Sequence, residues 1–480
     1  MDPHPMPEKK YPVAMTRENF QRIFVDCGDF NQRMVPVGPE RDPVWVFSID
    51  GLVSDTNVSD FVIKPLTGAK NRPCLEMAQE TIYNAVAKPL ADMDEAASKL
   101  VNGFCVVLFR ENEAAAFEVK TGEKRSVSAP EVETTVKGPK DAFTETVRTN
   151  TSLLRRHLRT PELRLREHIV GRRSLTNVTV CSIAGLTSQD MVAAVEQRLA
   201  TIDIDGLLTP AAVEEYLTGS RKTAFPLLIY TERPDRFAWG LLEGRVGILV
   251  DGLPLGYLLP CNLEDFLKSP EDRSGNYVAA SCIKFLRYLS LGAALLLPGF
   301  FGAVSLYHQE MIPASWLRAI GESRGAAPFS VGTEILLLLI AFELLQEAGL
   351  HLPQNLGQAV SIIGGLVVGS AAVEAGLVSP AALIVISAAG ICGYTLPQRD
   401  FADGIRVWRF VIAVSGLVAG MAGVTLGAIM LLIHLGDLRS LGRPYLGKLA
   451  QGRLPKLRSL LTREKYRDTV LEPKNMRNQR

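Results

Sequence analysis

The chain has 480 residues, with 52 Lys and Arg against 51 Asp and Glu, and a formal net charge of +1. This length allows two or three domains, and the balanced charge gives no global attraction to nucleic acid. Seven scattered cysteines without a Cys-x-x-Cys pair indicate neither a zinc site nor a disulfide framework. The charged, proline-rich residues 1–10 lack the apolar core of a signal peptide, so the N-terminal part is expected in the cytoplasm.

The first expected domain, residues 1–125, combines strand and helix signals and reads as a small α/β unit. Its predicted elements are a strand at 44–49 that ends in the turn dipeptide Asp50-Gly51, a helix at 74–90 and an apolar strand at 103–110. Composition then turns polar and proline-punctuated. This change predicts a boundary near residue 126.

The second expected domain, residues 126–282, alternates strands and helices more regularly. We predict strands at 177–183, 227–231, 246–250 and 255–259, and helices at 188–199 and 234–242. Such alternation favours an α/β layered domain over an all-helical adaptor. The water-facing half is therefore expected to hold two α/β subdomains.

The strongest local charge signal is a run of arginines between Arg155 and Arg173. We interpret it first as a solvated helix-and-loop face near anionic lipid headgroups. A specific acidic partner is the alternative. Nucleic acid is the weakest reading, because no aromatic residues that could stack on bases lie in the run.

Catalytic signatures are missing from the sequence. It contains no phosphate-binding loop, no dinucleotide-binding glycine motif, no His-Glu-x-x-His and no Gly-x-Ser-x-Gly. An enzyme is therefore the least favoured class, and we predict no catalytic residue, no metal site and no cofactor.

The expected third domain, residues 283–435, is mostly apolar, and a basic tail, 436–480, follows it. A helix needs about 20 apolar residues to cross the bilayer core. The segments that approach this length are 288–307, 331–348, 356–373, 377–396 and 410–435. The tail carries twelve Lys and Arg against four acids, which favours a cytoplasmic location. With both termini inside, we expect an even number of crossings, four, with one middle segment re-entrant.

Three acidic residues interrupt the second apolar segment: Glu334, Glu343 and Glu347. A carboxylate within hydrocarbon costs several kcal/mol unless it faces water, a partner or a cavity. Glu343 and Glu347 share one helix face, and Glu334 lies opposite Glu343. One reading places Glu347 and Glu343 at the solvated interface. The other makes these acids pore or subunit-interface charges.

Glycines form a second pattern in this half. Gly416, Gly420, Gly423 and Gly427 are expected on one stripe of the last helix, and Gly365 with Gly369 forms a Gly-x-x-x-Gly pair. Small residues let helix backbones approach closely in lipid. We predict helix packing at these positions, within one chain or between subunits. Several prolines near segment starts indicate short or broken helices, which favours a channel or transporter over a simple anchor.

From about Val136 to Tyr445, a series of short motifs occurs in the same order as in a known family. In these motifs the chain resembles the A-subunit family of spore germination receptors, the GerA family that also includes the stage V sporulation protein AF. The motifs include Lys137–Phe143, Arg148–Thr151, Ile202–Gly206, Tyr230–Asp235, Leu242–Val246, Ser269–Asp272, His308–Pro313, Gly357–Ile362, Ala371–Pro380 and His434-Leu435. Within them, Thr231–Asp235 is predicted to be structural. Pro234 suits the first position of a helix, and Thr231 can accept hydrogen bonds beside it.

This resemblance implies a multi-pass protein of the inner spore membrane that works with a B-type transporter-like subunit and a C-type lipoprotein subunit. It also implies a homo-oligomer that forms a gated monovalent-cation channel and helps to trigger germination. The alternatives are a stage V AF-like companion channel that amplifies ion release and a non-conducting membrane scaffold. The sequence departs from the family pattern at Leu339 and Gln346, where relatives often carry an acid and an arginine, respectively.

Overall fold

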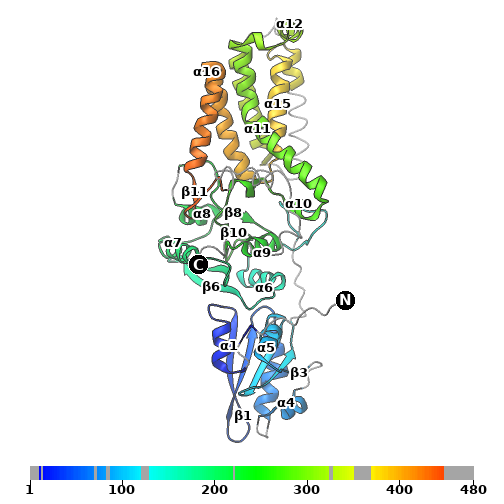
Figure 1. The fold of residues 1–480 in the computed structure, drawn as a ribbon, viewed down its shortest axis with the longest axis vertical. Helices are drawn as coiled ribbons and strands as arrows, with labels where there is room; N and C mark the ends of the chain where they lie inside the picture. The colour runs from blue at the N-terminus through cyan, green and yellow to red at the C-terminus, as the bar shows by residue number, and fades with distance from the viewer. Residues whose placement is uncertain are drawn as a thin grey trace. The chain divides into compact units, whose positions relative to one another are not determined.

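The computed structural model describes residues 10–11, 14–69, 73–82, 87–120, 129–219, 222–323, 328–350 and 369–447. The chain forms two compact units. The first runs to residue 220 and resumes at Leu228–Pro260, and it holds two β-sheets with their helices (Figure 1). The second combines residues 221–227 with the chain from Cys261 onward, and it holds the helical half.

The first sheet has the strand order β1-β2-β4-β5-β3, and all its pairs are antiparallel. The elements of this part are α1 (Arg17–Ile23), β1 (Phe30–Val37), β2 (Asp42–Ile49), α2 (Asp55–Asn57), η1 (Val58–Ile63), α3 (Lys64–Gly68), α4 (Leu75–Thr81), β3 (Ala87–Pro89), α5 (Met93–Val101), β4 (Phe104–Arg110) and β5 (Glu113–Glu118). The strands predicted at 44–49 and 103–110 are therefore present as β2 and β4.

Both faces of this sheet are covered by helices, because its central strands are apolar on both sides. Along β4, Val106 and Leu108 join the core formed with α1 and α5, whereas Cys105 and Val107 join the core formed with α3 and α4. Successive side chains of a strand point to opposite faces, so one continuous apolar strand serves two cores. Complete burial raises the pKa of the Cys105 thiol to about 12, which keeps it protonated.

The prediction of one helix over 74–90 is wrong beyond Thr81. Helix α4 ends there, and Ala87–Pro89 forms the edge strand β3 beside β5. Proline lacks a backbone N–H, so it is poorly tolerated within a helix but accepted at a sheet edge. Ile82, the C-cap of α4, already has an extended backbone, so the helix ends at Thr81, well before Pro89.

The second sheet has the order β6-β7-β9-β10-β8, again antiparallel. Its part of the chain contains α6 (Val147–His157), β6 (Leu163–Val170), β7 (Thr176–Ile183), α7 (Gln189–Ala200), α8 (Pro210–Thr218), β8 (Ile229–Thr231), α9 (Pro234–Leu242), β9 (Val246–Val250) and β10 (Gly256–Leu259). The four predicted strands and two predicted helices are confirmed within two residues at each end. Helix α9 begins at Pro234, as expected.

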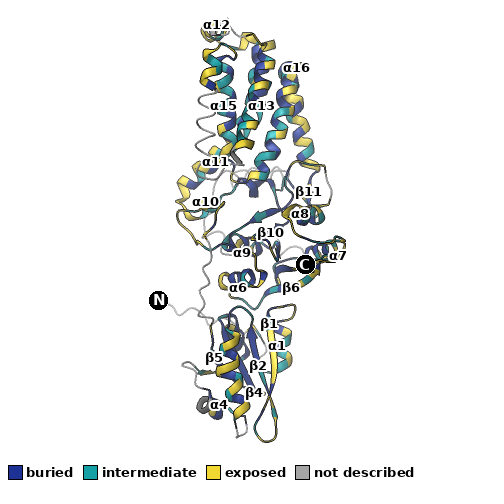
Figure 2. Cartoon of the chain, turned by 180° about the vertical axis from the view of Figure 1, so that it is seen from behind, coloured by how far each residue is buried: buried dark blue, intermediate teal, exposed yellow. Residues whose placement is uncertain are grey.

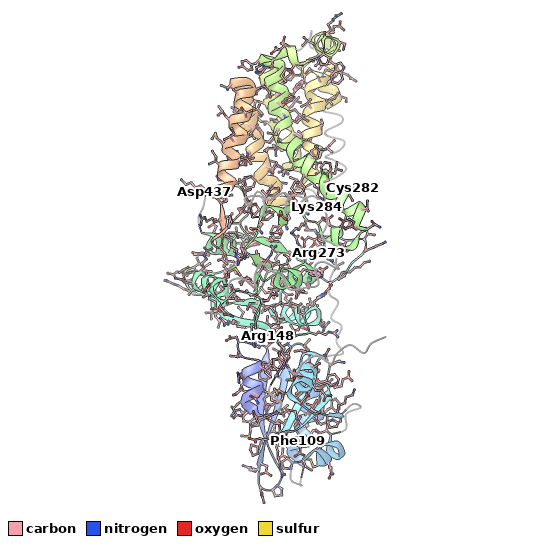
Figure 3. The ribbon with its side chains drawn as sticks, viewed as in Figure 1. Phe109, Arg148, Arg273, Cys282, Lys284 and Asp437 are labelled. Carbon is pink, nitrogen blue, oxygen red and sulfur yellow. The ribbon has the colours of Figure 1, made fainter. Side chains whose placement is uncertain are left out.

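The helical unit follows. Its elements are η2 (Leu263–Leu267), α10 (Pro270–Ser274), α11 (Tyr277–Tyr307), η3 (Gln309–Met311), α12 (Ala314–Ser323), α13 (Val331–Leu350), α15 (Pro380–Tyr394), α16 (Arg399–Asp437), β11 (Arg439–Ser440) and β12 (Arg443–Pro444). Near the start of α11, Lys284 is buried and Cys282 is exposed (Figure 3). Among the described residues, α11 and α16 are the helices long and apolar enough to cross a membrane, and α15 is apolar but shorter.

Helix α16 is a helical hairpin. Ala419 and Gly420 have non-helical dihedral angles, with φ of +62° at Gly420. Trp408 and His434 have ring centroids 5.4 Å apart. They are 26 residues apart, and a continuous helix would separate them by roughly 39 Å at about 1.5 Å per residue. The chain therefore reverses at Gly420 into two antiparallel arms, 399–418 and 421–437, seen side by side in Figure 1.

This reversal corrects two predictions. The segment 410–435 is not one straight span, and its four glycines do not form one stripe. Gly420 makes the bend, whereas Gly423 and Gly427 on the second arm face the first arm. A Cβ atom at Gly423 would come within 1.8 Å of the Ser415 carbonyl oxygen. Glycine is needed at Gly420 for its positive φ and at Gly423 for close backbone approach.

Candidate functional site

Glu334, the first of the three predicted acids, lies on the first turn of α13 and is completely buried. Its Oε1 atom accepts a hydrogen bond from the backbone N–H of Ser379, the N-cap residue of α15. The positive end of a helix dipole stabilises a nearby carboxylate. Its Oε2 atom has no hydrogen-bond partner among the described residues. Glu334 thus links α13 to α15 inside the helical unit.

Glu343 lies two and a half turns further along α13 and pairs with arginines of α16. Its carboxylate accepts a hydrogen bond from Arg409, whose side chain is only 3 % exposed, and lies 3.7 Å from Arg406. Arg406 also pairs with Asp403 at 3.0 Å. Two carboxylates and two guanidinium groups therefore form a neutral charge cluster in the described helices.

The arginine partners were missed because the predicted last span began at residue 410, just after Arg409. The signal was present in the sequence: Arg406 and Arg409, three residues apart, share one helix face that leads into an apolar run. Buried charges are nearly always paired, so Glu343 on one apolar helix and Arg409 on another were natural partners.

The remaining predicted positions are distributed as follows. Glu347 is exposed, one turn beyond Glu343. Gly369 is buried, and a Cβ there would lie 3.3 Å from Leu383 of α15. Gly365 lies outside the described residues, as does most of the expected segment 356–373. Gly416 faces α11, where an added Cβ would lie 2.7 Å from the Gly299 carbonyl oxygen. These contacts are all within one chain.

Leu339, on α13 between Glu334 and Glu343, is fully buried in an apolar cluster. Its neighbours there include Val331, Ile335, Ile386 and Ala413 from three helices. Figure 2 shows the complementary pattern, with exposed residues on the outer faces of α11, α15 and α16. Many large apolar side chains of the helical unit are exposed, whereas Glu334 and Arg409 are buried inside it.

The open end of the α16 hairpin holds a loop from the other part of the sequence. The ring of Phe225 lies 5.8 Å from that of Phe401 and 6.2 Å from that of His434. Thr223 Oγ1 lies 3.0 Å from His434 Nε2. Gly404 allows this approach, because a Cβ there would come within 2.8 Å of the Ala224 carbonyl oxygen. The His434-Leu435 motif thus holds loop 222–227.

The segment that follows the hairpin forms hydrogen bonds with loop 222–227 and with the chain at 261–263. Ser440 Oγ donates to the Leu227 carbonyl oxygen at 2.6 Å and accepts from the Cys261 N–H at 3.0 Å. The Leu263 N–H donates to the Tyr445 carbonyl oxygen at 2.9 Å. Leu227 and Cys261 are the residues at which the chain passes between the two compact units. Both passages are therefore anchored by the segment after α16.

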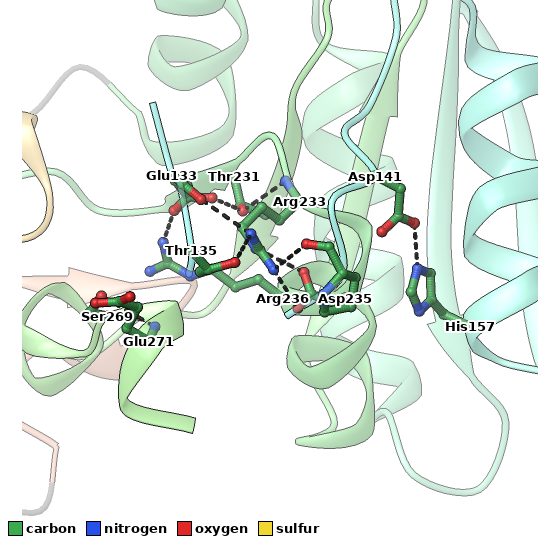
Figure 4. A network of polar contacts seen from close by, with 11 residues as sticks. Glu133, Thr135, Asp141, His157, Thr231, Arg233, Asp235, Arg236, Ser269 and Glu271 are labelled. Atoms are coloured by element: carbon green, nitrogen blue, oxygen red, sulfur yellow. Dashed lines mark hydrogen bonds and ion pairs between the residues drawn. The ribbon is translucent and has the colours of Figure 1, made fainter. Parts of the chain in front are cut away.

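The Thr-Glu-Arg-Pro-Asp motif, Thr231–Asp235, binds the extended segment 131–139 through a network of polar contacts (Figure 4). We call this network the polar clasp of the first unit. Arg233 is buried and donates to both carboxylate oxygens of Asp235 at 3.0 and 2.9 Å. It also donates to the Glu133 and Pro139 carbonyl oxygens and to Thr135 Oγ1 at 3.0–3.2 Å. One guanidinium group satisfies acceptors spread over seven residues of the segment.

The same clasp has a second row of contacts. The Glu232 carboxylate accepts hydrogen bonds from three successive backbone N–H groups, those of residues 131–133. Glu133 in turn pairs with Arg236 and accepts from the Thr231 hydroxyl, which itself accepts from the Arg233 N–H at 3.1 Å. The predicted structural role of Thr231 and Pro234 agrees with these contacts.

Asp141 and His157 hold the far end of the segment. The Asp141 carboxylate lies 2.6 Å from His157 Nε2 on α6, and this hydrogen bond lowers the pKa of Asp141. The expected proline-punctuated boundary between the sheets is thus an ordered strap from residue 131 onward, bound to the second sheet domain.

The arginine run is only partly a solvated helix-and-loop face: Arg156, Arg159, Arg172 and Arg173 are exposed. Residues Leu163–Val170 form strand β6, in which Leu163 and Leu165 are buried and arginines alternate with them. Arg155 on α6 is 0 % exposed and donates to Asp29 of the first sheet domain at 2.7 and 2.9 Å. Burial disfavours its charge, but Asp29 outweighs that effect and raises the pKa of Arg155.

Other arginines of the run also pair within the first unit. Arg166 binds Asp26 and Glu196, Arg172 binds Asp203, and Arg164 donates to the Ile23 and Val25 carbonyl oxygens. Backbone hydrogen bonds between Leu165 and both Asp26 and Gly28 accompany them. Arg155, Arg164 and Arg166 therefore join the two sheet domains to each other. The alternation of leucine and arginine in the run, a period of two, was the overlooked strand signal.

The described residues show no group of three or more His, Cys, Asp or Glu side chains able to hold a metal ion. The arrangement instead offers charge pairs inside an apolar helical half and polar straps in an α/β half.

Comparison with known proteins identifies the family. The family model described as "Bacillus/Clostridium GerA spore germination protein" matches residues 18–475. Spore germination protein KA of Bacillus subtilis (strain 168) is 35 % identical over 92 % of this chain and 84 % of its own length. Spore germination protein A1 of the same organism is 32 % identical, and the match covers 82 % of each chain.

The uncharacterized membrane protein YfkQ of Bacillus subtilis (strain 168) is 33 % identical over 93 % of this chain and 88 % of its own length. Among solved structures, the N-terminal domain of the A subunit of the Bacillus megaterium spore germinant receptor GerK3 is similar, with 26 % identity and a TM-score of 0.42. That match covers 52 % of this chain and 97 % of that one. On the match across residues 18–475, this chain belongs to the GerA family of spore germination proteins.

Proposed function

We propose that this chain is the A-type subunit of a nutrient germinant receptor, and that its helical half oligomerises in the inner spore membrane into a gated monovalent-cation channel. Membership of a family of spore germination proteins, together with charged side chains held inside an apolar helical half, carries the proposal. By the family resemblance, its partners are a B-type transporter-like subunit and a C-type lipoprotein subunit.

In this proposal the helical unit spans the membrane several times, with both termini in the cytoplasm. The α16 hairpin contributes two antiparallel crossings rather than one. Helices α13 and α15 run in the same direction, because Glu334 meets Ser379 near their starts and Phe342 meets Tyr394 further along. The predicted segment 356–373, most of which lies outside the described residues, is counted as a further crossing. With it the proposal has six crossings, instead of four with a re-entrant segment.

The neutral cluster of Glu343, Arg406, Arg409 and Asp403 supports a gating role. It joins α13 to the first arm of the hairpin. If these helices separated, the charged side chains of the cluster would lose their partners and face the space between the helices. Removing one member of a buried pair costs about 3–5 kcal/mol because its partner stays charged. We propose that the ion pair between Glu343 and Arg409 keeps the channel closed. Once the helices separate, Glu334 and Glu343 line the ion path.

Loop 222–227 supports a route by which the α/β half acts on the gate. It leads directly into β8 of the second sheet and places Phe225 at the open end of the hairpin. A shift of the sheet would therefore pull on the arm that carries Arg406 and Arg409. In this scheme the α/β half is a transducer.

The proposal is tested in spores whose only copy of the chain carries Glu343→Gln. We expect potassium release without nutrient, at least about threefold above the wild-type background, because Arg409 loses its partner. Glu374→Gln removes an exposed carboxylate of the same unit and serves as the matched control. The double variant Glu343→Gln/Arg409→Gln removes the unpaired charge and should release less than the single variant.

If Glu343→Gln spores hold the same amount of the protein, release no potassium spontaneously and respond normally to nutrient, the gating proposal fails. That outcome, combined with lost receptor clustering on removal of the α/β half, would favour the scaffold reading instead.

A further inference from the structure

Helix α12 is the least covered helix of the helical unit. It follows α11 after six residues and precedes α13 after seven, so it lies at one end of both helices (Figure 1). Nearly all its described side chains are exposed or half-buried, and Trp316 is 68 % exposed. An exposed tryptophan on a short helix needs an explanation, because burying such a large apolar side chain is favourable.

The sequence of α12 separates apolar from polar side chains. At about 100° per residue, Trp316, Leu317 and Ile320 fall on one face. Ser315, Arg318 and Glu322 fall on the opposite face. The helix is therefore amphipathic, and its polar face carries one positive and one negative charge.

Other exposed aromatic residues occur at the same end of the unit. Tyr307, the last residue of α11, is 50 % exposed, and Phe329, two residues before α13, is 41 % exposed. Aromatic side chains are enriched where membrane helices meet the headgroup region, because their rings suit a boundary between hydrocarbon and water. Tyr307, Trp316 and Phe329 form such a group around α12.

The length of α13 agrees with a position of α12 at the membrane surface. Helix α13 has 20 residues, about 30 Å, which matches the hydrocarbon thickness of a bilayer. A short amphipathic helix joined to the end of such a helix is held at the bilayer surface by the chain itself. Its apolar face then meets acyl chains and its polar face meets water.

From these observations we infer that α12 is an interfacial helix that binds the lipid surface through Trp316, Leu317 and Ile320, at the end of the bundle where α11 finishes and α13 begins. Binding is apolar, because the polar face has no net charge, so it does not depend on anionic lipid. The inference rests on the proposed membrane location of the helical unit.

The test uses the full-length chain in phosphatidylcholine nanodiscs that carry a nitroxide at carbon 5 or carbon 12 of the acyl chain. The fluorescence difference between wild type and Trp316→Phe isolates the Trp316 signal. We expect the carbon-5 label to reduce this signal about twofold and the carbon-12 label to reduce it less, since interfacial side chains lie at the headgroup–acyl boundary. Replacing a third of the lipid, roughly, with phosphatidylglycerol should leave the result unchanged.

Trp239 on α9 of the first unit supplies the matched control, because its signal, isolated with Trp239→Phe, should respond to aqueous iodide and to neither lipid label. A chain that does not enter nanodiscs contradicts the membrane proposal itself. If the chain enters and the Trp316 signal responds to iodide alone, or to neither lipid label nor iodide, α12 faces water or protein and the inference is overturned.

Discussion

Individual buried arginines, each paired with a carboxylate, help to specify the fold of this chain. Arg155, Arg233 and Arg409 are each nearly inaccessible, and each is paired with a carboxylate from another part of the chain or from the same turn. In sequence they look like ordinary surface arginines. Their role depends on partners up to 126 residues away, as with Asp29 and Arg155, and local patterns contain no information about such distant contacts.

The pair between Arg155 and Asp29 gives a direct test at this scale. We expect Arg155→Met to lower the free energy of unfolding of the α/β half by about 3–5 kcal/mol, because Asp29 remains buried and unpaired. Urea unfolding of the full chain in detergent, followed through Trp45 fluorescence, measures the loss. Arg156→Met, at the exposed neighbouring position, should cost less than about 0.5 kcal/mol.

The double variant Arg155→Met/Asp29→Leu separates charge from packing. If it recovers most of the lost stability, the unpaired carboxylate was the cause. Equal unfolding midpoints for Arg155→Met and Arg156→Met would show that the two sheet domains do not depend on this pair.

At the scale of elements, the α/β half was largely predictable because its strands are short, apolar and bounded by turn residues. Strands β2, β4, β7 and β9 all stood out in this way. The failures have local causes. The arginines of strand β6 obscured its alternating apolar pattern, and the helix predicted to residue 90 ends at Thr81, before the edge strand β3.

The α16 hairpin was unpredictable for a different reason. Hydropathy is uniform across the bend, and Gly420 is one glycine among four at helical spacing. Only the positive φ at Gly420 and the close approach of Gly423 to Ser415 reveal the reversal. The candidate acids stand out in the sequence, but the partners of Glu334 and Glu343 depend on the three-dimensional arrangement of α13, α15 and α16.

Spin labels test the hairpin. Val411 and Ile429 lie on opposite arms, nine residues on either side of Gly420, and both are exposed. In a continuous helix their Cα atoms would be about 27 Å apart. In the hairpin, where helices pack at about 8–10 Å, we expect a mean distance under roughly 20 Å between labels at Val411→Cys and Ile429→Cys in nanodiscs.

The singly labelled variants control for signal from native cysteines such as the exposed Cys282. A distribution centred near the straight-helix distance would show that α16 continues through Gly420. It would also restore the single glycine stripe expected from the sequence.

At the scale of the whole molecule, the chain has an α/β half with polar straps and a helical half with many exposed apolar side chains. Loop 222–227 and the segment around Ser440 lie where the chain passes from one to the other. A receptor subunit that converts nutrient recognition into ion release needs such a connection, and the family to which this chain belongs acts in germination.

Potassium release from spores that lack this chain, measured nutrient by nutrient, tests the central claim most directly. The proposal that the chain is an A-type receptor subunit predicts that release is lost for one set of nutrients and normal for the others. Complementation with the intact chain should restore it. A general slowing for every nutrient would contradict the receptor role in favour of the amplifying companion, and normal release with every nutrient would contradict both.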